Sequence, residues 1–124
     1  MKSTFYGFVL DPDKFPNVEI GTLRREGEPD RQLYAKFDAD DRFEQGQVVD
    51  REVQRIRFLV GRDEDHAKGG IATPLRGDQW IRPGDQASDP YWAFTGEISG
   101  VTAHSHQLTF ERSVPSLIGN RGIR

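Results

Sequence analysis

The chain has 124 residues and a formal net charge of −3 at pH 7, with 20 acidic residues against 17 lysines and arginines. This length fits one domain. No apolar run approaches the roughly 18 residues of a membrane span, and the first residues lack the apolar stretch of a secretory signal, so neither class is expected. Cysteine is absent, which excludes disulfides and cysteine nucleophiles and favours a cytoplasmic location.

Short segments in which apolar and polar residues alternate, separated by turn residues, predict an all-β fold. Gly21 interrupts one of these alternations and predicts a β-bulge. Residues 47–52 fit a strand and a helical turn equally well. The expected strands cover Phe5–Leu10, Val18–Leu23, Leu33–Phe37, Val53–Val60 and Ile71–Leu75.

The second half of the chain predicts a loop and then a β-hairpin. Tyr91–Ile98 and Val101–Phe110 alternate on either side of a Ser-Gly pair that suits a turn. Residues 113–124 show no periodicity and predict a flexible tail. We therefore expect a small antiparallel barrel over residues 1–76, with residues 77–112 forming a loop and an appended hairpin packed on it.

Several short motifs follow one another in the order found in a known family. Leu33-Tyr34-Ala35-Lys36-Phe37 is similar to a strand of the form Val-Phe-Val-His-Phe, Gly46-Gln47-Val48-Val49 fits Gly-Gln-x-Val, and Lys68-Gly69-Gly70 stands at a Lys-Gly turn. With these motifs, residues 5–75 resemble a diverged cold-shock domain, a small oligonucleotide-binding (OB) barrel. The resemblance implies binding of single-stranded RNA or DNA. Ile20 and Thr22 stand where the family has aromatic residues, and the chain after Leu75 has no counterpart.

Single strands are held by aromatic rings on which bases stack and by cations that contact phosphates. Tyr34 and Lys36 are two residues apart on one strand and share a face, whereas Phe37 points to the other face. Tyr34 is therefore the better stacking platform. The candidate nucleic-acid-binding residues are Phe8, Arg24, Arg25, Tyr34, Lys36, Phe37, Arg55 and Arg57.

A protein-interaction module on the same scaffold is the alternative function. Aromatic residues near arginines are typical of interface hot spots, and the residues that fit this description are Trp80, Arg82, Tyr91 and Trp92. The same aromatic residues would equally suit a small core beneath the hairpin. The acidic net charge favours the protein-interaction function, and the Tyr34 strand favours nucleic-acid binding.

Catalysis and metal binding have little support in the sequence. There is no Gly-x-Ser-x-Gly or Gly-x-x-x-x-Gly-Lys motif. His104 and His106 would share a strand face, but no further ligands accompany them at a recognisable spacing. We therefore expect no enzyme activity, no metal and no cofactor. The choice between RNA, DNA and a protein partner, and the oligomeric state, stay open.

Overall fold

The computed structural model describes residues 9–37, 44–48 and 51–115, and its regular structure consists of β-strands. All strand pairings are antiparallel. The described residues include no helix that is long and apolar enough to cross a membrane. The strands are β1 (Val18–Arg24), β2 (Arg31–Phe37), β3 (Glu44–Val48), β4 (Arg51–Gly61), β5 (Gln79–Ile81), β6 (Trp92–Ser99) and β7 (Ser105–Pro115).

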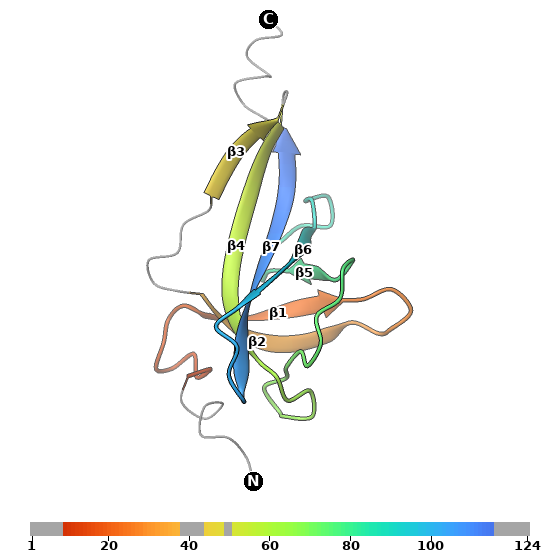
Figure 1. Ribbon diagram of the computed structural model, residues 1–124. Helices are drawn as coiled ribbons and strands as arrows, with labels where there is room; N and C mark the ends of the chain where they lie inside the picture. Colours follow the sequence, from red (N-terminus) through yellow and green to blue (C-terminus); the bar gives the residue numbers. More distant parts are fainter. Residues whose placement is uncertain (1–8, 38–43, 49–50, 116–124) are drawn as a thin grey trace, which may run out of the picture.

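Six of these strands form a closed barrel in the order β1-β2-β4-β7-β6-β5, and β5 pairs again with β1. Figure 1 shows β4 and β7 running side by side along the molecule, with β1 and β2 lying across them. The ends of β3, β4 and β7 project together beyond the other strands (Figure 1), and among the described strands β3 has β4 as its one partner. The expected all-β antiparallel barrel is confirmed.

The expected division into a barrel and an appended hairpin is not confirmed. β5, β6 and β7 supply half of the closed barrel, and β7 pairs with β4 along the whole of both strands, from Arg51↔Pro115 to Gly61↔Ser105. The hairpin is therefore part of the barrel wall. Of the predicted flexible tail over residues 113–124, residues 113–115 belong to β7. Residues 116–124 lie outside the described part of the chain.

The alternation of apolar and polar residues correctly predicted the positions of strands β1, β2 and β4. Of the ambiguous residues 47–52, those that the structure describes lie in strands, with Val48 opposite Arg51. The predicted strand over residues 71–75 is wrong: Ile71 donates its backbone N–H to the Gly61 carbonyl and the segment continues as a loop. Of the predicted Phe5–Leu10 strand, only the last two residues are described, and they lie in a turn.

The barrel is filled by aromatic and branched side chains that meet at its centre. Phe58 on β4 stacks on Phe110 of β7 with ring centroids 5.2 Å apart, and it contacts Trp80 of β5 at 4.7 Å. The indoles of Trp80 and Trp92 are 0% and 1% exposed. The core, which covers both halves of the chain, consists of Leu23, Leu33, Ala35, Phe37, Ile56, Phe58, Val60, Ile71, Trp80, Trp92, Phe94, Leu108 and Phe110.

Gly21 does not form the predicted bulge. The β1–β2 register continues unbroken through Gly21↔Leu33. Gly21 instead faces the core, where the Trp80 ring occupies the space that a side chain would need. The observed irregularity lies in β6, where the register with β7 shifts between Phe94 and Ile98, and Gly96 there has a φ of 94°.

Candidate nucleic-acid interface on the outside of strands β1 and β2

The outer face of β1 and β2 carries the most informative of the predicted residues. Because side chains alternate along a strand, the buried residues Gly21, Leu23, Leu33 and Ala35 fix which neighbours point outward. We define the outer face by those outward residues, which are Ile20, Thr22 and Arg24 on β1 with Gln32, Tyr34 and Lys36 on β2. The structure thus brings together three of the predicted residues, Arg24, Tyr34 and Lys36.

Tyr34 is half-buried in the middle of the outer face, opposite Ile20. The Lys68 ammonium lies 4.3 Å from the centre of its ring. Lys68 comes from the loop between β4 and β5, and its carbonyl accepts a hydrogen bond of 2.9 Å from the Tyr34 N–H. The backbone bond therefore holds this lysine beside the ring.

Lys36 forms a second pair of the same kind. Its ammonium lies 4.3 Å from the centre of the Phe15 ring, at the edge of the outer face. Phe15 is positioned by the chain before β1, since its N–H donates to the Asp11 carbonyl and its carbonyl accepts from Val18. A hydrogen bond from Phe37 N–H to the Asn17 carbonyl continues the β1–β2 pairing and fixes this segment against β2.

Arg24 lies at the other end of the outer face, four residues along β1 from Ile20. It binds both carboxylate oxygens of Asp30, at 3.2 and 2.9 Å. The hydrogen bonds and the positive charge of Arg24 lower the pKa of Asp30. Arg24 also donates a hydrogen bond of 2.8 Å to the Tyr91 hydroxyl, and its guanidinium lies 5.3 Å from the centre of that ring. Arg24, Tyr91 and Asp30 therefore form one fixed group.

The outer face is basic although the protein is acidic. Apart from Arg24, Tyr34 and Lys36, the outward side chains of β1 and β2 are neutral. The same holds for the outward side chains of the adjoining strand β5. These neutral residues are Ile20, Thr22, Gln32, Gln79 and Ile81. Glu19 lies at the start of β1 and binds Arg82 in an ion pair. Among the described residues, Arg24 pairs with Asp30, and neither Lys36 nor Lys68 makes an ion pair with a carboxylate.

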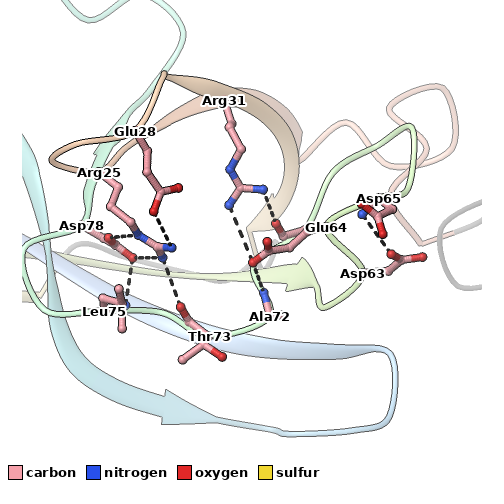
Figure 2. Close-up of polar contacts among 11 residues, drawn as sticks. Arg25, Glu28, Arg31, Asp63, Glu64, Asp65, Ala72, Thr73, Leu75 and Asp78 are labelled. Atoms are coloured by element: carbon pink, nitrogen blue, oxygen red, sulfur yellow. Dashed lines mark hydrogen bonds and ion pairs between the residues drawn. The ribbon is translucent and has the colours of Figure 1, made fainter.

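Arg25, another of the candidate nucleic-acid-binding residues, does not belong to the outer face. It forms a two-pronged ion pair with Asp78, with Nε–Oδ1 and Nη2–Oδ2 distances of 2.8 and 2.7 Å. Asp78 is 1% exposed and also accepts a hydrogen bond from the Leu75 N–H. Arg25 donates further to the Thr73 carbonyl at 3.1 Å (Figure 2). Its guanidinium therefore holds the loop before β5 and is not free for phosphate.

Arg31 anchors the same long loop at a second point, nearer Lys68. It donates to the Gly70 carbonyl at 3.1 Å and lies 4.0 Å from the Glu64 carboxylate. Glu64 in turn accepts a bond of 2.9 Å from the Ala72 N–H (Figure 2). Gly69 packs against Leu33 with a φ of 75°, a conformation that favours glycine. The loop that carries Lys68 is thus fastened beside the part of β2 that precedes its pairing with β4.

The β4 arginines lie on the barrel wall next to β2. Arg55 is exposed and pairs with Glu111 of β7 at 3.0 Å. Arg57 is exposed on the same face of β4, two residues from Leu59, which is the register partner of Lys36. Two residues span about 7 Å along a strand. Arg57 therefore lies close to the Lys36 end of the outer face, whereas Arg55 lies farther away and is neutralised.

The remaining predicted residues do not form an exposed site. Phe37 is in the core beneath the guanidinium of Arg82, 4.4 Å away. Trp80 and Trp92 are buried, so they cannot act as anchors for a protein partner in this structure. Of the residues given for that alternative, Tyr91 is the exposed one, at 41%. Phe8 lies outside the described residues.

Sequence reasoning missed Phe15 and Lys68 as neighbours of the predicted pair. Lys68 stands in the Lys-Gly-Gly motif, but its position over Tyr34 depends on a loop of more than ten residues between two strands. His104 and His106 separate: His104 is exposed before β7, and His106 is buried inside the barrel wall. Among the described residues, no group of three or more His, Asp or Glu side chains is placed to hold a metal ion.

Comparison of the chain with protein-family models, with curated proteins and with solved structures finds no significant match. The resemblance to a cold-shock domain therefore has no family-level support.

Proposed function

We propose that the protein binds single-stranded nucleic acid on the outer face of β1 and β2. The observation that carries this proposal is the double pairing of an aromatic ring with a lysine, Tyr34 with Lys68 and Phe15 with Lys36, on one side of the barrel. Bases stack on such rings regardless of their sequence, and ammonium groups beside them reach the phosphates. A base that stacks on Tyr34 takes the place of Lys68 over the ring and leaves the lysine next to the backbone.

The arrangement of charge supports the same proposal. The binding of a polyanion to a protein with a net charge of −3 requires a local surface from which carboxylates are absent or paired. On the outer face, Asp30 is neutralised by Arg24, and at its edge Glu19 is neutralised by Arg82. The cations Lys36 and Lys68 contact aromatic rings, and in the described residues neither makes an ion pair with an acid. They therefore keep their charge available for phosphates.

The proposal is tested by fluorescence anisotropy with a labelled single-stranded oligonucleotide at low salt. Wild-type protein is expected to bind, and Tyr34→Ala is expected to weaken binding by a factor of about 5–150, the value of one stacked base. Tyr34→Phe keeps the ring and should retain most of the affinity. Arg76→Ala removes an exposed arginine of the loop before β5, whose guanidinium lies beside Gly96 of β6, and serves as the control for loss of one positive charge.

Two results would contradict the proposal. The first is the absence of binding by wild-type protein to either RNA or DNA at low salt. The second is equal binding by wild-type protein and Tyr34→Ala, provided that the variant unfolds at the wild-type temperature. A protein partner would then become the better hypothesis, and the exposed Ile20 (46%) and Tyr91 (41%) would be the side chains to substitute next.

A further inference from the structure

The inference drawn here rests on the proposed function and concerns the extent of the binding site. Tyr91 and Arg24 repeat, at the far end of the outer face, the aromatic–cation pairing of Tyr34 and Phe15. Tyr91 immediately precedes β6 in a segment for which the cold-shock resemblance has no counterpart. We propose that it is a third stacking platform, so that the nucleic-acid site continues across β1 toward β6.

The geometry of the Tyr91 group suits this role. Tyr91 is 41% exposed, and it is the one aromatic side chain among the described residues that is exposed. Its hydroxyl accepts the Arg24 bond, and Arg24 is itself held by both oxygens of Asp30, so the ring cannot turn freely. A ring already fixed in place loses little conformational entropy when a base stacks on it.

Among the described residues, the outward side chains of β1, β2 and β5 between the two ends carry no charge. The β1 register places Thr22 opposite Gln32 on one side and opposite Ile81 on the other. None of these three side chains repels a phosphate, and β5 adds only Gln79 next to Arg24. From Ile20, opposite Tyr34, to Arg24 is four residues, or about 13 Å along the strand. A strand that fills all three platforms must therefore cover roughly 20 Å, since Lys36 lies about 7 Å beyond Tyr34 in the other direction.

This extent makes the binding depend on the length of the nucleic acid. A very short strand can occupy Tyr34 and Phe15, or Tyr91, but cannot reach both ends. We expect an oligothymidylate of about 12 nucleotides to bind clearly more tightly than one of about 4, the lower limit of site sizes seen for single-strand-binding barrels. The short strand is measured as a competitor against the labelled long one, so that weak binding is still detected.

The decisive variant is Tyr91→Ala, measured with the long strand. It is expected to weaken binding by a factor of about 5–150, and the combined Tyr34→Ala, Tyr91→Ala variant by roughly the product of the two single effects, because the rings are separate. Tyr91→Phe loses the hydroxyl that bonds to Arg24 but keeps the ring, so it should retain most of the affinity. Ile98→Ala removes an exposed apolar side chain (42%) elsewhere on β6 and should bind as wild type.

The outcomes separate this inference from the proposed function. If Tyr34→Ala weakens binding but Tyr91→Ala does not, or if the short strand competes as well as the long one, the site ends at Tyr34 and the third platform is wrong. If neither strand binds wild-type protein at low salt, the proposed function itself fails. If Tyr91→Phe loses as much affinity as Tyr91→Ala, the hydroxyl bond and not the ring is responsible, which also overturns the third platform.

Discussion

Gly21 on β1 and Trp80 on β5 occupy adjoining space in the core, so that the absence of a side chain at Gly21 makes room for the indole. A β-carbon built on Gly21 would have the Trp80 atom Cη2 2.8 Å away, and two other ring atoms closer still. Trp80 is completely buried and contacts Phe58 and Phe110. The ring therefore cannot move aside without disturbing the rest of the barrel.

Gly21→Ala is consequently expected to destabilise the protein strongly. Overpacking of a core typically costs about 1–3 kcal/mol, and the immobility of Trp80 places this substitution at the upper end. Denaturant unfolding followed by tryptophan fluorescence measures the change. Thr22→Ala, on the outward side of the same strand, is the control and should change the free energy of unfolding by less than about 0.5 kcal/mol. A Gly21→Ala variant as stable as this control would contradict the packing argument.

The buried ion pair between Arg25 and Asp78 gives a second prediction. Asp78→Ala leaves the guanidinium of Arg25, whose side chain is 16% exposed, without its carboxylate. Breaking one partner of a buried pair costs about 3–5 kcal/mol, and here the Leu75 N–H also loses its acceptor. Asp30→Ala removes the partner of Arg24 from an exposed pair and should have a much smaller effect on thermal unfolding. Equal losses in the two variants would show that burial of Asp78 contributes nothing.

His106 predicts a dependence of stability on pH. Burial lowers the pKa of this imidazole, and the positive charge of Arg62 acts in the same direction, while a backbone hydrogen bond to Ile71 opposes both. In the unfolded chain the imidazole of His106 takes up a proton near pH 6.5, whereas in the folded protein it does so only at lower pH. The free energy of unfolding should fall as the pH falls below about 6.5, because protonation favours the unfolded state.

His106→Leu tests this interpretation. The variant places an apolar side chain inside the wall and removes the titrating group. Its stability should therefore vary less between pH 6.5 and pH 5 than that of the wild type. Chemical unfolding at several pH values gives the slope. His104→Leu is the control, since His104 is exposed. If the wild type and His106→Leu lose stability in parallel over this range, the dependence comes from other groups.

The salt dependence of binding gives a fourth prediction, which applies if the proposed function holds. Lys36 and Lys68 each contact an aromatic ring and reach one phosphate in the proposed complex. Each phosphate neutralised on a single strand contributes about 0.7 to the slope of log affinity against log salt concentration. Lys36→Ala and Lys68→Ala should each reduce the slope by about this amount, whereas Arg76→Ala should leave it unchanged. Unchanged slopes in both lysine variants would place the phosphates elsewhere.

The alternation of residues was sufficient to predict the strands whose two faces differ. Val18–Leu23 and Leu33–Phe37 each bury one side and expose the other, so their outward residues, including Tyr34 and Lys36, could be assigned in advance. The ion pair of Arg25 could not be predicted, because Arg25 lies just beyond the end of β1, where alternation no longer applies, and its partner Asp78 is distant in the sequence. The bulge predicted at Gly21 is wrong because a glycine that interrupts the alternation has two explanations. The backbone can be irregular there, or a large ring can fill the space of the missing side chain, and the sequence alone does not distinguish them.

The closure of the barrel was beyond local reasoning. β5 has three residues in a stretch rich in glycine, proline and aspartate, yet it joins β1 to β6 and carries Trp80 into the centre. Such a short strand forms because β1 and β6 pair with it on each side, and its own three residues show too little alternation to predict it. Local reasoning therefore leaves the aromatic residues around it divided between an interface and a separate small core, whereas Trp80 and Trp92 belong to the core of the barrel and Tyr91 is exposed.

The pairing of β4 with β7 along their entire length has a consequence for how the protein is made. During synthesis β1, β2 and β4 leave the ribosome before β7. Until β7 emerges, the edge of β4 that will pair with it is exposed along its whole length. Exposed strand edges are the places where nascent chains associate with one another, and contacts between distant segments form slowly. Shortening the chain before β7 should therefore yield an insoluble product and not a smaller working barrel, even though the proposed binding strands would all be present.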